Sequence, residues 1–470
     1  MFNDYIELQK QEMIDNLMKL VAIPSVAAAP NENAPFGKDV DKALSFVSSL
    51  AENMGFKAKN LKNCAEIIFG ENKAEKVYIA GHIDIVPPGD GWTSSPFQLT
   101  IRDGKMFGRG VLDDKGPSIA ALYAMKAIKE LGYKPNAQIR LILGGNEENG
   151  MTDLKEYIEK AGLPDYALTP DSSFPIINAE AGVLQGTFET SNITEEGEVS
   201  LMSLRGGNAF NSVPDICRVV LSVPRSRQNE IKPILSDRSF KVTDFEYYFN
   251  NETLFITTYG KAAHGSVPEK GENACFKAVK IVSEILSATK SKNSYIEFIE
   301  KYFTDDTKGT KLGVACADQI IGDLSVNVGI CDYDRKNQKM IAVDLRLPIK
   351  AAAKDIESKL YKAAECGGMR YKRADLLEST YVSENSEFLK KLSRCYEKVS
   401  GKKCRTLSAR GATYAKCFQG RGVAFGPINE ENAEEGGNMH SADEYLSVKA
   451  FLDLAKIYAL SIYELWVKKD

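Results

Sequence analysis

Hydrophobic and polar residues alternate regularly along the first 180 residues of the chain. Short apolar runs bounded by turn residues predict buried strands at 65–69, 77–80, 139–143 and 166–168. A longer stretch, 116–135, places Pro117 in a first helical turn and Gly132 near a helix end, so it predicts a helix. Helical spacing at the N-terminus predicts another helix that ends before Pro24. Strands separated by such helices predict an α/β fold with a mostly parallel mixed sheet flanked by helices.

The pattern changes at about residue 183. Strand-like stretches with polar interruptions follow one another, and only 273–287 and 352–364 have the spacing of amphipathic helices. Such segregated elements predict an α+β domain with an antiparallel sheet. Helical patterns return later, up to a C-terminal run at 448–466. We therefore predict a first domain of residues 1–182 and 378–470 with an inserted domain of residues 183–377.

Composition and charge exclude several classes of protein. A chain of 470 residues is too long for one hydrophobic core, and 43% hydrophobic with 26% charged residues is ordinary for a globular protein. A net charge of −4 gives no basic surface for nucleic acid. The N-terminus lacks the apolar core of a signal peptide, and no stretch is long and apolar enough to span a membrane. Nine scattered cysteines without a Cys-x-x-Cys pair favour reduced thiols, so we expect a cytoplasmic protein.

Polar residues gather in five short turns, four of which follow or adjoin predicted strands and helices of the first domain. The five stretches are GHIDIVPPGDGW (81–92), GRGVLDDKGP (108–117), LILGGNEENG (141–150), DYALTPDSSFP (165–175) and GGNMHSADEY (436–445). In open α/β sheets, ligands bind beyond the carboxyl ends of the strands. We therefore expect these turns to meet at one edge of the sheet.

The carboxylates at that edge predict a metal site. Unpaired carboxylates a few ångströms apart repel one another, and divalent cations remove the repulsion. Imidazole and carboxylate ligands suit zinc, and manganese or cobalt are alternatives. We predict two divalent metal ions per chain, zinc first, with a water molecule between them. The predicted metal ligands are His82, Asp113 as the bridge, Glu148, Asp171 and His440.

Two neighbouring acids receive other roles. Asp84 is predicted to accept the second ring N–H of His82 and so fix its tautomer. Glu147 is predicted to take a proton from the water and deliver it to a leaving amine. Each motif also has a simpler interpretation, because Asp113 or Asp114 could cap a helix, Asp171 could be a turn residue, and acidic pairs are often solvated. The combination of motifs, in order after apolar strands, favours the metal site.

These motifs resemble the M20 family of metallopeptidases, most closely its dipeptidase V (PepV-like, Xaa-His dipeptidase) branch. Further matching stretches are GGNAFNSVPD (206–215), GKAAHGSVPE (260–269) and DLRLP (344–348), and the resemblance extends from about residue 80 to 445. It implies a di-zinc exopeptidase-like catalytic domain with an inserted lid domain. It also implies a cis peptide bond between Asp113 and Asp114, and it supports the roles given above.

The resemblance implies roles for residues of the lid. His264 matches the family histidine that reaches the scissile carbonyl oxygen, where a proton donor stabilises the oxyanion. Asn211 is expected to bind the same oxygen or the substrate backbone. Arg346 matches the family arginine that binds the substrate's C-terminal carboxylate with its two-pronged guanidinium.

One segment departs from the branch pattern. Related dipeptidases usually have Gly-Gly-Gly-Thr-Tyr-Ala, whereas this chain reads SARGATYAKCF (408–418), with Arg410 and Ala412 on either side of Gly411. Gly411 and Thr413 are still predicted to contact the substrate. The replacements leave the preferred substrate side chain open.

The predicted function is hydrolysis of dipeptides that have a free C-terminal carboxylate, by a metal-bridging water activated by Glu147. The alternative is an N-acyl amino acid deacylase of the same metallohydrolase family, which would recognise an acyl group instead of a free α-amine. A non-catalytic binding protein would be favoured by loss of Glu147 or of a metal ligand, and the sequence has lost neither. We expect a monomer that has no nucleic-acid or membrane partner.

Overall fold

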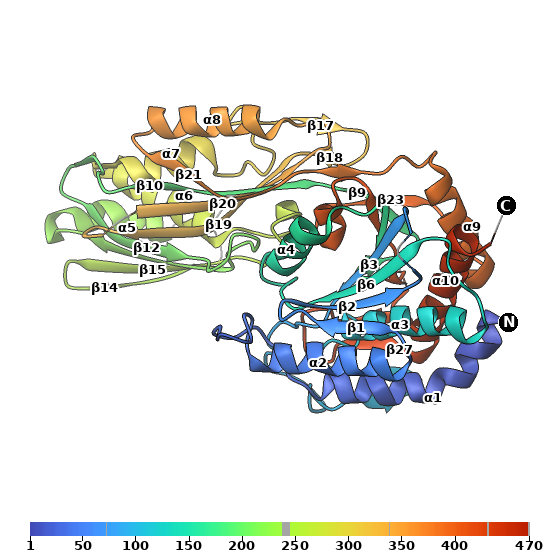
Figure 1. Cartoon of the computed structure of the whole chain (residues 1–470). Coiled ribbons are helices and arrows are strands. Elements are labelled where there is room, and N and C mark those ends of the chain that lie inside the picture. The colour runs from blue at the N-terminus through green and yellow to red at the C-terminus, as the bar shows by residue number, and fades with distance from the viewer. Residues whose placement is uncertain (72, 237–244, 338, 430–431, 469–470) are drawn as a thin grey trace. The chain divides into compact units, whose positions relative to one another are not determined.

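The computed structural model describes residues 1–71, 73–236, 245–337, 339–429 and 432–468. The chain forms two compact units, one of residues 1–179 with 380–470 and one of residues 180–379 (Figure 1). The domain limits expected from the sequence, 183 and 377, stay a prediction.

The described residues of the first unit build a nine-stranded mixed sheet. Its order is β1-β2-β6-β3-β7-β24-β9-β22, with β23 paired to β9. Strands β6, β3, β7 and β24 run parallel, and antiparallel strands flank them. The strands of this sheet are β1 Lys57–Asn60, β2 Cys64–Phe69, β3 Lys76–His82, β6 Gln138–Gly144, β7 Tyr166–Thr169, β9 Ile176–Glu180, β22 Thr380–Tyr381, β23 Thr406–Ala409 and β24 Gly422–Ala424. The predicted α/β fold with a mixed sheet is confirmed.

Both faces of this sheet are buried, which explains why its central strands read as unbroken apolar runs. Along β3, Val77 and Ile79 join a core with α1, α3 and α10, whereas Tyr78 and Ala80 join a second core with α4. The helices are α1 Phe2–Val21, α2 Lys38–Asn53, α3 Lys115–Glu130, α4 Thr152–Ala161, α9 Glu387–Ser400, α10 Val448–Trp466 and the short 3₁₀ helix η3 Tyr414–Phe418. The alternation of side chains along a strand thus fixes two helical layers.

Smaller strands complete the first unit. A four-stranded sheet has the order β26-β27-β5-β4, and β25 pairs with β8. These strands are β4 Thr100–Arg102, β5 Lys105–Phe107, β8 Ser172–Ser173, β25 Pro427–Ile428, β26 Gly436–Gly437 and β27 Tyr445–Ser447. The pairing of β27 with β5 brings the C-terminal part of the chain beside the turn that precedes α3.

The second unit contains an eight-stranded antiparallel sheet in the order β14-β15-β13-β12-β19-β20-β10-β21. Its strands are β10 Gly182–Thr190, β12 Ser200–Gly206, β13 Ile216–Ser222, β14 Phe245–Asn250, β15 Thr253–Tyr259, β19 Ser325–Asp334, β20 Lys339–Leu347 and β21 Arg370–Leu377. The helices are α5 Gln228–Ser236, α6 Ala274–Ala288, α7 Ser294–Tyr302, α8 Ala353–Cys366 and the 3₁₀ helices η1 Arg225–Arg227 and η2 Pro268–Lys270. Two short antiparallel pairs, β11 Glu195–Glu196 with β16 Lys292–Asn293 and β17 Ala317–Asp318 with β18 Gly322–Asp323, lie outside the main sheet. Helices α6, α7 and α8 share one core with the sheet.

The sequence pattern missed both edge strands of this sheet, β14 and β21. Strand β21 reads RYKRADLL and is exposed at most positions, so it lacks the apolar alternation of a half-buried strand. Edge strands commonly have such charged side chains, because charge discourages pairing with other chains. No helix formed by the described residues is both long enough and apolar enough to cross a lipid bilayer.

Candidate metal centre

The topology of the first unit explains why distant residues meet. His82 is the last residue of β3, Glu148 follows β6 by four residues, and Asp171 follows β7 by two. These strands are parallel, so their carboxyl ends lie at one edge of the sheet. Asp113 lies in the turn before α3, and His440 lies in the loop between β26 and β27.

Asp113 lies between the two histidines, with one carboxylate oxygen toward each. Its Oδ1 is 2.9 Å from His82 Nε2, and its Oδ2 is 2.8 Å from His440 Nε2. Asp171 Oδ1 is 3.8 Å from His82 Nε2, and Glu148 Oε1 is 3.3 Å from His440 Nε2. Two groups of potential ligand atoms result, each with all atoms within 4.8 Å of one another: His82, Asp113 and Asp171, and Asp113, Glu148 and His440.

The charges of this cluster are far from balanced. Burial, together with the charge of Asp171, raises the pKa of Glu147 well above its usual range, and burial also raises the pKa of Glu148 and Asp171. Burial alone would raise the pKa of Asp113 too, but hydrogen bonds from His440 and His82 lower it. Hydrogen bonds to Asp113 and Glu148 raise the pKa of His440 to about 10. Protonated histidines thus supply the positive charge that cations would supply in a loaded site.

The residues fit a pair of divalent cations. The donor set combines two imidazoles with carboxylates, which is the mixture that zinc accepts and that manganese and cobalt tolerate. Glu148 Oε1 is a buried oxygen that faces His440 Nε2 at 3.3 Å, and both atoms belong to one ligand group. This long contact compensates the buried carboxylate oxygen only in part, and a bound cation would compensate it more fully.

Asp84 is fully buried and holds the Glu147–Glu148 turn in place. Its carboxylate accepts hydrogen bonds from the backbone N–H groups of Glu147 and Glu148, both at 3.2 Å. The ring atom His82 Nδ1 lies 3.0 Å from the backbone oxygen of Asp84 and 3.4 Å from its carboxylate. The hydrogen bond that fixes the tautomer therefore goes to the Asp84 backbone, which leaves His82 Nε2 to face the ligand group.

The structure does not support a capping role for the aspartate pair. Asp114 is the residue before α3 but makes no capping hydrogen bond, and its Oδ2 instead accepts the backbone N–H of His82 at 3.1 Å. The Asp113–Asp114 peptide bond is cis, as the resemblance implied. The carboxylate of Asp113 faces the histidines, so neither aspartate caps the helix.

Tyr414 and Asp153, which the sequence reasoning did not identify, form a set of buried contacts next to the Glu147–Glu148 turn. The ring of Tyr414 meets the ring of His82 edge-on, with centroids 6.4 Å apart, and the Tyr414 hydroxyl donates to Asp153 Oδ2 at 2.5 Å. The same oxygen accepts the backbone N–H of Asn146 at 2.8 Å. Tyr414 belongs to the segment that departs from the branch pattern, which was the available signal.

Gly411 and Thr413 lie just before this tyrosine. Gly411 has open space where a side chain would project, and the Thr413 hydroxyl caps η3 by accepting the backbone N–H of Ala415 at 3.1 Å. The capping bond accounts for the threonine locally. Contact of either residue with a substrate stays a prediction.

The second unit brings its own three predicted residues together. Gly265 N–H donates to the backbone oxygen of Asn211 at 2.7 Å, so the turn with His264 lies against the turn with Asn211. Ser325 pairs with Arg346 across the sheet, and its hydroxyl donates to the backbone oxygen of Ser266 at 3.3 Å. Asn211 and His264 are exposed, which suits residues that bind a ligand.

Arg346 is buried, and its guanidinium is oriented by an aspartate two residues away on the same strand. Nε and Nη2 donate to the two carboxylate oxygens of Asp344 at 2.7 and 2.9 Å. Gln185 Nε2 donates to Asp344 Oδ2 at 2.8 Å. This bidentate pair fixes the plane of the guanidinium, and the role of Arg346 toward a substrate stays a prediction.

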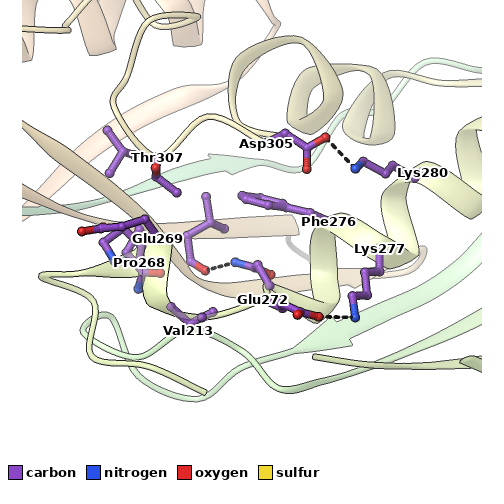
Figure 2. Close-up of a pocket in the computed structure, with 14 residues that line it drawn as sticks. Val213, Pro268, Glu269, Glu272, Phe276, Lys277, Lys280, Asp305 and Thr307 are labelled. Atoms are coloured by element: carbon purple, nitrogen blue, oxygen red, sulfur yellow. Dashed lines mark hydrogen bonds and ion pairs between the residues drawn. The ribbon is translucent and has the colours of Figure 1, made fainter. Parts of the chain in front are cut away.

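A cavity of about 290 Å³ lies beside the His264 turn, between α6, η2 and β19 (Figure 2). Phe276 projects into it, and Lys277 and Lys280 pair with Glu272 at 2.8 Å and with Asp305 at 2.5 Å. Two of its carboxylates are therefore paired with lysines, and neither ligand group described above includes a residue of the cavity. The cavity does not resemble a metal site.

Comparisons with known proteins agree with this geometry. The family model described as Peptidase family M20/M25/M40 matches residues 78–464. The chain is 32% identical to the putative dipeptidase YtjP of Bacillus subtilis (strain 168), with 97% of this chain and 98% of that protein covered. It is 31% identical to the Beta-Ala-Xaa dipeptidase of Lactobacillus delbrueckii subsp. lactis, with 99% and 98% covered.

Solved structures show the same fold. Human carnosine dipeptidase 1 superimposes with a TM-score of 0.57 at 17% identity, with 98% of both chains covered. The dipeptidase Dug1p of Saccharomyces cerevisiae superimposes with a TM-score of 0.59 at 16% identity, with 98% of this chain and 97% of that chain covered. A family match over most of the chain, together with full-length relatives above 30% identity, means that this chain belongs to the M20 family of metallopeptidases.

Proposed function

We propose that this M20 metallopeptidase is a dipeptidase of the PepV-like, Xaa-His branch, which hydrolyses dipeptides with a free C-terminal carboxylate. The observation that carries the proposal is the position of Asp113, which shares its two oxygens between two ligand groups. Full-length relatives named as dipeptidases, one of them a Beta-Ala-Xaa dipeptidase, support the substrate class.

The ligands divide between two cations. His82 and Asp171 would hold one, Glu148 and His440 the other, and Asp113 both. Two divalent ions, zinc first and manganese or cobalt as alternatives, would polarise the scissile carbonyl and lower the pKa of a water molecule. Asp84 holds the ligands in position, because its carboxylate accepts hydrogen bonds from the backbone N–H groups of Glu147 and Glu148 and lies against His82.

Proton transfer is assigned to Glu147. Its carboxylate is partly buried beside the ligand Glu148, in a turn anchored by Asp84. We propose that Glu147 takes a proton from the attacking water and passes it to the leaving amine, as a general base and then a general acid. Asn211 and His264 would bind the carbonyl oxygen as its charge develops, and Arg346 would bind the terminal carboxylate.

A substrate panel separates this function from its alternative. The purified chain is stripped of metal, reloaded with zinc, manganese or cobalt, and assayed with Ala- and β-Ala-dipeptides, dipeptide amides, and N-acetyl and N-succinyl amino acids. A dipeptidase cleaves the free dipeptides and cleaves the amides poorly, because the amides lack the carboxylate. Preferential cleavage of N-acyl amino acids would establish the deacylase instead.

Replacement of the proposed general base tests the mechanism. Glu147→Ala should abolish turnover while the protein still binds metal, since Glu147 belongs to neither ligand group. Unchanged turnover would reject the role of Glu147.

We also propose that the chain works as a cytoplasmic monomer. All nine cysteines lie in described segments and are free thiols, which fits a reducing compartment. Light scattering after size-exclusion chromatography measures the mass, and a value near 51.8 kDa is expected.

A further inference from the structure

A buried ion pair joins the two turns that carry Asp113 and His440. Arg109 Nη1 lies 2.6 Å from Glu444 Oε2, and the two side chains are 1% and 0% exposed. Arg109 precedes Asp113 by four residues, and Glu444 follows His440 by four. Neither charged residue has a part in the chemistry proposed above.

Glu444 does more than neutralise Arg109, because its carboxylate accepts hydrogen bonds from several backbone N–H groups of the Asp113 turn. Oε1 accepts from Leu112 at 2.8 Å, from Asp113 at 3.1 Å and from Gly110 at 3.1 Å. The N–H of Gly110 is shared with Oε2, also at 3.1 Å. The backbone oxygen of Glu444 accepts the N–H of Gly108 at 3.1 Å. Residues 108–113 are thus hydrogen-bonded to one residue of the His440 loop.

The His440 loop needs such an anchor. His440 is half exposed, and Asn438, His440 and Asp443 all have positive φ angles of 56–60°, a backbone region that non-glycine residues seldom adopt. No regular hydrogen-bonded element includes residues 438–444. Without external bonds, the position of His440 Nε2 relative to Asp113 would be loosely defined.

Two further contacts restrain this loop, one with Thr93 and one within the loop itself. Asp443 Oδ1 accepts hydrogen bonds from the backbone N–H and the hydroxyl of Thr93 at 2.9 and 3.0 Å. Asn438 Nδ2 donates to the backbone oxygen of Asp443 at 3.1 Å. Asp443 is only partly buried and Asn438 is exposed, whereas Glu444 is fully buried, so Glu444 is the buried anchor of the loop.

We propose that Glu444, charge-balanced by Arg109, is a positioning residue that sets the distance between His440 and Asp113 and thereby preorganises the metal site of Asp113, Glu148 and His440. This inference rests on the proposed two-metal centre. It predicts unequal effects, because His440 belongs to only one of the two sites, whereas the site of His82, Asp113 and Asp171 is connected to Glu444 only through the backbone of the Asp113 turn. A pair retained for stability alone would affect both sites equally or neither.

The test is metal binding by the full-length chain, without substrate. Metal-depleted wild type and Glu444→Gln are titrated with Zn²⁺ by calorimetry, and with Co²⁺ by visible absorption, which reports ligand geometry. Wild type is expected to bind two ions. Glu444→Gln should lose about 10–100-fold in affinity at the site that contains His440, the range seen when partners of metal ligands are removed, and a smaller factor at the other site.

The control is a partly buried acid–arginine pair of the same unit. Glu66 lies 3.1 Å from Arg140 on neighbouring strands, and neither residue bonds to a ligand turn. Glu66→Gln should lower stability and leave both metal affinities unchanged. If Glu444→Gln behaves like Glu66→Gln, with both affinities at the wild-type value, the positioning role is refuted.

A milder variant covers the case in which Glu444→Gln does not fold. Asp443→Asn weakens a partly buried anchor of the same loop, and it should reduce affinity at the site that contains His440 by a smaller factor. Wild-type affinity in Asp443→Asn together with an unfolded Glu444→Gln would assign the pair to stability and overturn the proposal. A wild-type protein that binds two ions but cleaves no dipeptide would reject the proposed function only, whereas binding of one ion would reject both.

Discussion

Asp153 allows a quantitative test of how strongly burial near the candidate metal centre raises the pKa of a carboxyl group. Its side chain is fully buried and accepts hydrogen bonds from Tyr414, from Asn146 and from Leu154. Burial, together with the negative charge of Asp84, raises the pKa of Asp153 from 3.8 to about 6. The three hydrogen bonds favour the carboxylate, and the remaining increase shows that burial outweighs them.

The sign of the effect follows from proton linkage. Between pH 3.8 and about 6 the native protein keeps a proton on Asp153 that the unfolded chain has lost, so stability falls as the pH rises through this window. Over the whole window the loss is about 3 kcal/mol, at about 1.4 kcal/mol per tenfold change in proton affinity. Between pH 5.0 and 7.5 it is about 1–2 kcal/mol.

Asp153→Asn removes the titrating group but keeps the shape. At pH 5.0 the variant should be less stable than the wild type by about 1–2 kcal/mol, because the amide cannot accept all three hydrogen bonds. The free energy of unfolding of the wild type minus that of the variant should also shrink by about 1–2 kcal/mol from pH 5.0 to 7.5. Urea unfolding of both metal-free proteins measures this, since titration of the ligand groups is common to both and cancels.

The control is Asp103→Asn, at an exposed residue with positive φ in the turn between β4 and β5, where asparagine is accepted. Its difference from the wild type gives the baseline for replacing one exposed aspartate. A pH-independent difference for Asp153→Asn, or a difference that grows with pH, would refute the conclusion that burial dominates at Asp153.

Three further predictions concern the metal, the packing and the substrate carboxylate. His440, whose pKa is about 10, must lose its proton to bind a cation. Metal affinity measured by calorimetry should therefore rise by about tenfold per pH unit between pH 6 and 8 for each proton that binding releases. A pH-independent affinity would contradict this. Gly144→Ala should cost about 2–3 kcal/mol in urea unfolding, because the new Cβ would lie 1.8 Å from the Tyr414 hydroxyl and 2.3 Å from Asp153 Oδ2. Gly411→Ala, which meets no atom within 4 Å, should change stability by less than about 0.5 kcal/mol. Arg346→Lys should raise KM for dipeptides by about 10–100-fold with little change in kcat, since lysine lacks the two-pronged geometry, whereas Arg205→Lys on the exposed face of β12 should leave both constants unchanged.

Much of the fold could be predicted because the central strands are buried on both faces. Runs such as 77–80 and 139–143 are apolar at every or nearly every position, and they coincide with parts of β3 and β6. The helix expected at 448–466 has these limits in the structure. Edge strands such as β21 escaped prediction, since a strand with a charged, exposed face has no apolar period to detect.

The ligand groups could be anticipated for a related reason: carboxyl ends of parallel strands meet at one edge whatever the details of the loops. The residues that hold those groups in place are harder to detect, because they act on backbone N–H groups that every residue type offers. Glu444 bonds to residues more than 330 positions away, and Asp84 acts through the backbone of the Glu147–Glu148 turn.

One signal for the Arg109–Glu444 pair is nevertheless present in the sequence. Arg109 lies four positions before Asp113, and Glu444, of opposite charge, lies four positions after His440. Both turns are rich in glycine and polar residues, and a charge buried in either of them needs a partner. Two buried charges of opposite sign near ligands that must meet are therefore expected to pair with each other, as Arg109 and Glu444 do at 2.6 Å. A metal ligand on an irregular loop needs support of this kind, because the loop itself supplies no hydrogen-bond ladder to fix its position. Charges near predicted ligands should accordingly be tested first as partners of one another, before a role in the chemistry is assigned to them.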